Sequence, residues 1–152
     1  MKTNIATTKD QSARLLRCGV PTDTADMHWH GAIVPRGGSL TSMPEPSEEW
    51  DLWATPYSCM PEELQAAKLM EDYTEIVPAW SLSALLGLLP NPITFNGRSA
   101  IIGLYHEEEK NGGGWNCSYL GIKFFIEKTP FEAIIKMIEW LTENNYKLNE
   151  IN

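Results

Sequence analysis

A thirteen-residue segment without a single charge most constrains the fold of this chain. It reads PAWSLSALLGLLP and runs from Pro78 to Pro90. A helix that crosses a bilayer needs about 20 apolar residues, so this segment is too short to do so. It predicts instead a helix that is buried nearly all round, or one that offers a surface to a partner. We favour burial, with Trp80 in the core, because few other segments can fill the centre of the protein.

The charge of the chain limits the classes of partner. The 152 residues carry a net charge of −8, and Lys and Arg are dispersed apart from a mildly basic stretch with Lys9, Arg14 and Arg17. A protein that binds DNA or RNA needs a basic stripe that displaces counterions from phosphates. We therefore expect no nucleic-acid partner, and no membrane partner either, because no segment is long enough to span a bilayer.

Length and cysteine content predict the domain organisation and the compartment. A chain of 152 residues with 43% hydrophobic content fits a single globular domain over residues 1–152. Its three cysteines, Cys18, Cys59 and Cys117, are odd in number and widely spaced, which is typical of free thiols in a reducing compartment. The first residues, MKTNIATTKDQ, lack the apolar stretch of a secretory signal. We expect a cytoplasmic protein.

Local signals predict a helix near the N-terminus, followed by a strand. Thr8 and Gln11 have the spacing of a capping box, in which each side chain bonds to the other residue's backbone N–H. The expected apolar face of this helix consists of Ala13, Leu15, Leu16 and Cys18. Residues 22–27 predict one further short turn with Thr22 as its cap, and residues 27–34 predict a strand.

The segment from Ser39 to Pro61 is rich in Pro and Ser, and we interpret it as a long loop with a candidate short strand at 50–54. Trp50, Trp53 and Tyr57 lie in this loop among acidic residues. Aromatic side chains inside a polar rim are typical of binding surfaces. These three residues are therefore the predicted partner-binding residues. The alternative, that they hold the loop to the domain, stays open.

The C-terminal half predicts a small antiparallel sheet. Asn96-Gly97 is the strongest two-residue signal for a hairpin, and it separates expected strands at 93–95 and 99–105. Further strands at 115–119 and 122–127 extend these into a meander. The predicted fold class is α+β, a small antiparallel sheet with helices packed mainly on one face.

The last helix has the most complete set of signals. Thr129 is the expected cap, Pro130 suits the first helical position, and Glu132 can bond back to the cap. We expect the helix to run to about Asn144 and to cover one face of the sheet with an apolar stripe. The stripe consists of Phe131, Ile134, Ile135, Ile138 and Leu141.

Two histidines and a cysteine are the candidates for chemistry. His28 and His30 stand two positions apart on a predicted strand, so both imidazoles could face one metal, with His106, Cys117 or a carboxylate as a third ligand. No HExxH or CxxC motif supports such a site, and we prefer two polar residues on the solvent side of a strand. Cys117 with His106 could act as nucleophile and base, but the alternation over 115–119 favours a buried cysteine. We expect no metal and no cofactor.

Three segments carry a family resemblance. They are VPTDTADMHW (Val20–Trp29), VPAWSLSALLGLLP (Val77–Pro90) and FEAIIKMIEWLTENNY (Phe131–Tyr146). They resemble an uncharacterised family of small proteins from gut Bacteroides-type bacteria and their prophages and mobile elements. That family has no assigned activity, so the resemblance implies an accessory role in a mobile element rather than a metabolic role.

Together these patterns predict a non-catalytic accessory or binding protein that acts by protein–protein contact, with an association with phages or mobile elements. The alternative is a small enzyme or metal-dependent binder that uses His28, His30 and Cys117. A deep pocket where titratable groups converge would favour the alternative, and an exposed aromatic patch would favour the binding protein. The sequence leaves the partner and the oligomeric state open.

Overall fold

The computed structural model describes residues 5–33, 46–54 and 75–149, and this part of the chain forms three α-helices and several small antiparallel sheets. The helices are α1 (Lys9–Arg17), α3 (Leu82–Leu88) and α4 (Pro130–Glu143), with 3₁₀ turns η1 (Thr22–Thr24) and η3 (Glu109–Asn111). The strands are β1 (Met27–Ile33), β2 (Pro46–Trp53), β3 (Glu75–Ala79), β4 (Ile93–Phe95), β5 (Arg98–Ala100), β6 (Ile102–His106), β7 (Trp115–Tyr119) and β8 (Lys123–Glu127). Their orders in the sheets are β2-β1-β3, β4-β5 and β6-β7-β8. The predicted α+β class is confirmed.

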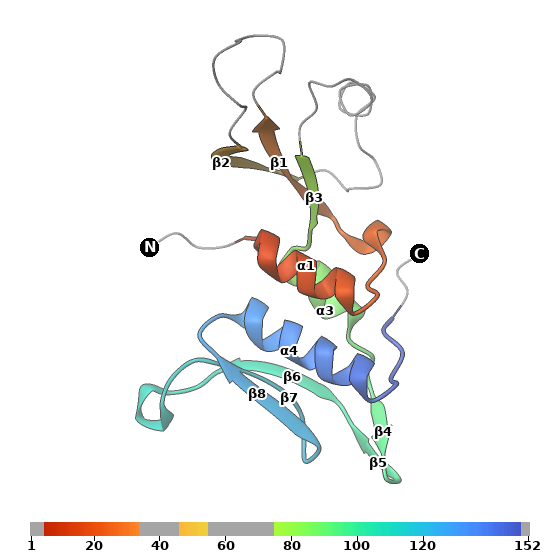
Figure 1. Ribbon diagram of the computed structural model, residues 1–152. Helices are drawn as coiled ribbons and strands as arrows, with labels where there is room; N and C mark the ends of the chain where they lie inside the picture. The colour runs from red at the N-terminus through yellow and green to blue at the C-terminus, as the bar shows by residue number, and fades with distance from the viewer. Residues whose placement is uncertain (1–4, 34–45, 55–74, 150–152) are drawn as a thin grey trace, which may run out of the picture.

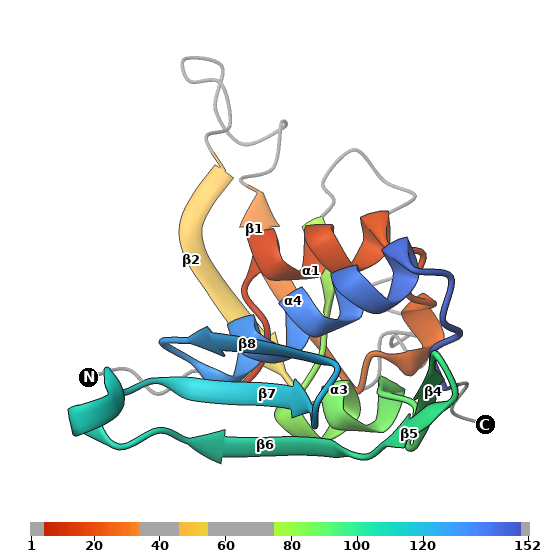
Figure 2. The ribbon, with the colours of Figure 1, turned by 90° about the horizontal axis from the view of Figure 1, so that it is seen from below.

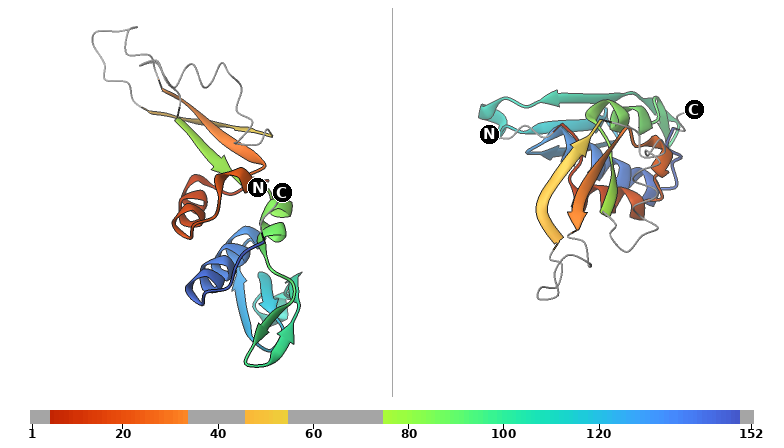
Figure 3. Two further views of the ribbon diagram at one scale, coloured as in Figure 1. Left: turned by 90° about the vertical axis from the view of Figure 1, so that its right-hand side faces the viewer. Right: turned by 90° about the horizontal axis from the view of Figure 1, so that it is seen from above.

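The helices lie between two sheets. Figure 1 shows β1, β2 and β3 at one end of the molecule, β6, β7 and β8 at the other, and α1, α3 and α4 between them. Helix α1 packs on α4 and β3, and α4 packs on α3, β7 and β8. The side view in Figure 3 shows the same order of layers. All three helices therefore lie on one side of the β6–β7–β8 meander, as predicted.

One apolar core joins these layers. Helix α4 fills much of it with its predicted stripe, together with Ala133 and Met137, and every one of these side chains is at most 4% exposed. Trp80 is fully buried, which confirms the core position that we favoured. Its Nε1–H donates to Thr24 Oγ1 at 2.9 Å, so the polar atom of the indole is satisfied inside the core.

The N-terminus of α4 has the predicted cap and first-turn proline, but one predicted hydrogen bond is missing. Thr129 Oγ1 accepts from the Glu132 backbone N–H at 3.1 Å, and Pro130 occupies the first turn. The expected reciprocal bond of Glu132 is wrong, because its carboxylate accepts instead from Gln11 and Arg14 of α1. A charged donor on a neighbouring helix forms a stronger bond than the local backbone N–H offers.

Helix α1 has the predicted capping box but a different buried face. Both bonds between Thr8 and Gln11 are present, at 3.0 and 3.2 Å. Leu15 and Ser12 are the buried residues, whereas Leu16 is 39% exposed, so the predicted apolar face is wrong in part. Ser12 can be buried because its hydroxyl pairs with that of Thr7 at 2.8 Å.

The short turn after α1 exists, but Thr22 is not its cap. Pro21 occupies the cap position of η1, and Thr24 Oγ1 donates to the Pro21 carbonyl at 2.6 Å. The expected strand at 27–34 is confirmed as β1, which ends at Ile33.

The charge-free segment is not one helix. Pro78 and Ala79 belong to β3, which pairs with β1, and α3 covers only Leu82–Leu88. Ser81 caps α3 by accepting from the Ala84 N–H at 3.2 Å. Burial all round is wrong for Leu86, which is 36% exposed. The pairing of β3 with β1 joins segments far apart in sequence, so no local period reveals it.

Strand β2 replaces part of the predicted loop. Residues 46–53 pair antiparallel with β1, with Trp50 opposite Gly31 and Trp53 opposite His28. The candidate strand at 50–54 therefore exists, and it begins earlier, at Pro46. The rest of the predicted loop lies outside the described residues except for Ala54.

Candidate interaction surface

The β6–β7–β8 sheet has one covered face and one open face. Successive residues of a strand point to opposite faces, so the register of the three strands assigns each side chain to one of them. Cys117 and Tyr119 of the central strand point toward α4 and are fully buried. Asn116 and Ser118 point the other way, and Figure 2 looks onto that face, with the helices behind the sheet.

Large apolar side chains stand on the open face. Tyr105 is 49% exposed, Phe124 is 62% exposed and Ile126 is 42% exposed. The two rows of cross-strand neighbours on this face are Tyr105–Asn116–Ile126 and Gly103–Ser118–Phe124. Leu120, in the turn that joins β7 to β8, is 81% exposed. Aromatic and branched side chains gathered on one exposed face are typical of an interaction surface.

A shallow hollow of about 320 Å³ lies on this face beside Tyr105 and Phe124. Asn116 and Ser118 line it from the central strand, and Lys123 lines it from β8. Aromatic and polar residues line the hollow, and its lining includes no histidine or acidic residue. It therefore fits recognition of a partner better than acid–base chemistry.

Asn116 is the polar centre of the open face. It is 5% exposed, and its Nδ2–H donates to Glu107 Oε1 at 2.9 Å. This bond fixes the orientation of the amide, because a carboxylate only accepts. Asn116 Oδ1 is buried and has no hydrogen-bond partner among the described residues. A buried acceptor without a donor costs free energy, so Asn116 Oδ1 is a local cost to stability in this sheet.

The partner-binding residues predicted from the sequence lie elsewhere. Trp50 and Trp53 are in β2, in the sheet at the opposite end of the molecule from the open face (Figure 1). Their side chains, like the whole of Tyr57, lie outside the described part of the structure. Their role in binding therefore stays a prediction.

His28 and Cys117, two of the residues proposed for a metal or catalytic site, are not brought together. His28 is fully buried in β1, between β2 and β3, so the expected position on the solvent side is wrong for it. Cys117 lies in the other sheet, and burial raises its pKa to about 12, which keeps the thiol protonated. His106 is exposed, and its ring lies edge-on to that of Trp115, with 5.2 Å between the ring centroids. The side chain of His30 lies outside the described residues. Within those residues, no three His, Cys, Asp or Glu side chains are grouped so as to hold a metal ion.

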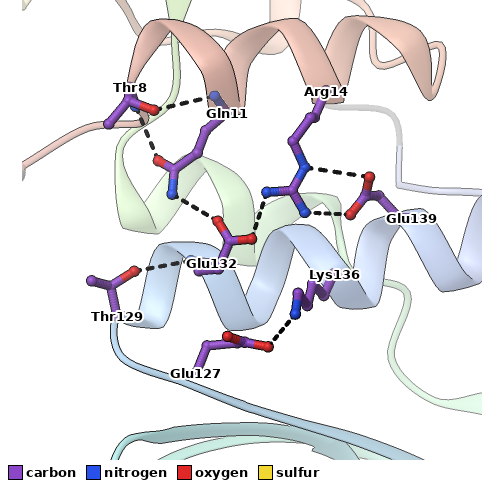
Figure 4. A network of polar contacts seen from close by, with 8 residues as sticks. All are labelled: Thr8, Gln11, Arg14, Glu127, Thr129, Glu132, Lys136 and Glu139. Atoms are coloured by element: carbon purple, nitrogen blue, oxygen red, sulfur yellow. Dashed lines mark hydrogen bonds and ion pairs between the residues drawn. The ribbon is translucent and has the colours of Figure 1, made fainter.

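A charged cluster joins α1 to α4, away from the open face. Figure 4 shows the Arg14 guanidinium between Glu132 and Glu139, with one contact of 2.5 Å to each carboxylate. The hydrogen bond to Glu139 raises the pKa of Arg14 against the effect of burial. Burial acts to raise the pKa of Glu132, but hydrogen bonds from Arg14 and Gln11 outweigh it and lower that pKa. Because its charges are paired with one another, we assign this cluster a structural role in holding the two helices together.

Comparison with known proteins gives no match among family models, curated proteins or solved structures. The resemblance to small proteins of gut bacteria and their mobile elements therefore stays a prediction. In the part of the chain that the structure describes, no helix has both the length and the apolar character needed to cross a membrane.

Sequence patterns alone did not single out the open face, although residues 122–127 carry its signal. A half-exposed strand alternates apolar and polar residues, whereas Phe124, Phe125 and Ile126 place apolar groups on both faces of β8. A single covering helix can bury only one of these faces. The other set of side chains must then meet solvent or a partner.

Proposed function

We propose that the protein is a non-catalytic accessory or binding protein that contacts another protein through the open face of the β6–β7–β8 sheet. The observation that carries this proposal is the exposure of Tyr105, Phe124 and Ile126 on a sheet whose opposite face is packed against α4. Aromatic anchors of this kind dominate the affinity of protein interfaces.

The proposal includes the biological setting expected from the sequence. A cytoplasmic location is supported by the odd number and wide spacing of the three cysteines, and the lack of a nucleic-acid partner is supported by the net charge of −8. An association with phages or mobile elements is supported by the resemblance of Val20–Trp29, Val77–Pro90 and Phe131–Tyr146. The identity of the neighbouring genes tests this association directly.

The experiment compares alanine substitutions on the open face with an alanine substitution at an exposed isoleucine away from that face. Ile126 lies on the open face, whereas Ile5, which is 63% exposed, is next to Ala6, whose backbone pairs with Ser81 and not with this sheet. Proteins retained by the wild type from native-host lysate are identified and purified, and their binding to each variant is measured by titration. We expect F124A and I126A to weaken binding by about tenfold or more, as loss of an interface anchor does. The control variant I5A should bind as the wild type does.

Two results would contradict this assignment. Equal binding of F124A and I5A would exclude the open face as the recognition surface. Loss of binding in W50A or W53A, with F124A unaffected, would place recognition at β2 instead, as the sequence first suggested.

A further inference from the structure

Strand β8 lies at the edge of its sheet. In the order β6-β7-β8 it pairs with β7 on one side, and no strand within the described residues pairs with it on the other. An unpaired edge presents a row of backbone N–H and C=O groups that can pair with another chain. Natural edges are commonly protected by charges or by proline, as Pro78 protects β3. Strand β8 instead carries one charge of each sign, one at either end.

The sequence of β8 is self-complementary. It reads Lys-Phe-Phe-Ile-Glu, with Lys123 and Glu127 at equal distances on either side of Phe125. If two copies pair antiparallel about Phe125, Lys123 lies opposite the partner's Glu127 and Glu127 lies opposite the partner's Lys123. Opposite charges at facing positions stabilise an antiparallel pair. The other edge strand, β6, offers no such match, because pairing about Leu104 sets Ile102 opposite a histidine.

The two faces of β8 would both contribute to this pairing. Lys123 and Glu127 stand on the α4 side, where Glu127 Oε1 already contacts Lys136 Nζ at 2.5 Å and leaves its second oxygen for a further cation. Phe124 and Ile126 stand on the open face, and each would lie opposite the other residue of the partner. Their present exposure, 62% and 42%, would then fall as two apolar pairs form.

We propose that a second copy of this chain pairs antiparallel with β8 about Phe125, joining two three-stranded sheets into one of six strands. In this two-fold arrangement, each β8 edge is paired with the β8 edge of the other copy, so neither is left for a third copy and the assembly closes as a dimer. The inference goes beyond the proposed function and does not rest on it, because the ion pairs lie on the α4 side of the sheet. The dimer would join two open faces into one continuous surface.

Charge reversal tests the pairing. Sedimentation equilibrium should give the wild type twice the mass of the 17.1 kDa chain. K123E and E127K should each weaken the dimer on the order of tenfold or more, because each turns two attractions into two repulsions. An equimolar mixture of the two variants should form a heterodimer, since every facing pair is then again opposite in charge. K128E makes the same charge change just beyond the strand, at an exposed residue, and should leave the dimer intact.

A second measurement needs only the wild type, in case E127K fails to fold with its new lysine beside Lys136. Hydrogen exchange of the β8 amides should slow as chain concentration rises, while that of the β6 amides should not change. A wild type that stays monomeric at millimolar concentration would overturn the proposal. So would a dimer that K123E leaves intact, a variant mixture that does not associate, or a mass that grows beyond two chains.

Discussion

The two faces of the β6–β7–β8 sheet differ in what covers them, because α4 packs on only one of them. On the covered face, Cys117 and Tyr119 are fully buried under α4, and the Tyr119 hydroxyl donates to the Pro90 carbonyl at 2.6 Å. On the open face, β6 exposes Tyr105, and β8 exposes Phe124 and Ile126. One face therefore contributes to stability, and the other leaves its apolar area for contacts outside the fold.

The largest effect should come from the side chains that cover the buried face. Ile138 of α4 is fully buried in the core, and I138A should lower the free energy of unfolding by about 2–5 kcal/mol, through lost burial and an unfilled cavity. Urea unfolding measures this loss. A change below about 0.5 kcal/mol would show that α4 does not pack on the sheet as described, and the contrast between the faces would disappear.

The next largest effect tests whether the ion pairs of Arg14 hold α1 against α4. Arg14 is 23% exposed between Glu132 and Glu139, so R14M should cost about 1–3 kcal/mol, between the values of exposed and fully buried ion pairs. Arg17, in the same helix but exposed, provides the matched control R17M, which should change stability by less than about 0.5 kcal/mol. Equal effects of the two variants in urea unfolding would show that the cluster in Figure 4 does not fasten α1 to α4.

The same cluster predicts a dependence on pH. The pKa of Glu132 is lowered from 4.5 in the folded protein, so the charged carboxylate stabilises the fold above that value and loses this contribution as the pH falls through its folded pKa. The difference in unfolding free energy between the wild type and E132Q should therefore shrink as the pH is lowered from 7 to about 3. Adding R14M to both proteins should remove most of this pH dependence. A difference that stays constant down to about pH 3 would mean that Arg14 does not lower the pKa of Glu132.

How far the sequence predicts this molecule depends on whether the signal is local. The cap at Thr129, the stripe of α4 and the Asn96-Gly97 turn were predicted because their determinants lie within a few residues of one another. The strand at Pro78-Ala79 and the use of Glu132 by α1 were not, because both depend on partners far along the chain.

The candidate surface was missed for a related reason. The aromatic residues Trp50, Trp53 and Tyr57 stand out by composition, so the sequence directed attention to them. Phe124 and Ile126 look like core residues in the sequence, since only the packing of α4 decides which face of β8 is buried. Apolar residues on both faces of a strand are typical of burial on both sides, so the pattern of β8 did not indicate that one of its faces is open.

The smallest expected effect is that of I126A, which makes on the open face the same isoleucine-to-alanine change as I138A makes on the covered side. Ile126 is 42% exposed, so I126A removes only part of the buried area that I138A removes and should lower the free energy of unfolding by about 1 kcal/mol in dilute protein. I138A, the same change on the covered side, is expected to cost several times more. A loss of about 2 kcal/mol or more from I126A in dilute solution would show that the open face is covered in the folded monomer, and the proposed interaction surface would be wrong. A loss that appears only as chain concentration rises would instead be the sign of a second copy paired along β8, because Ile126 then lies opposite the partner's Phe124 and its contribution depends on mass action.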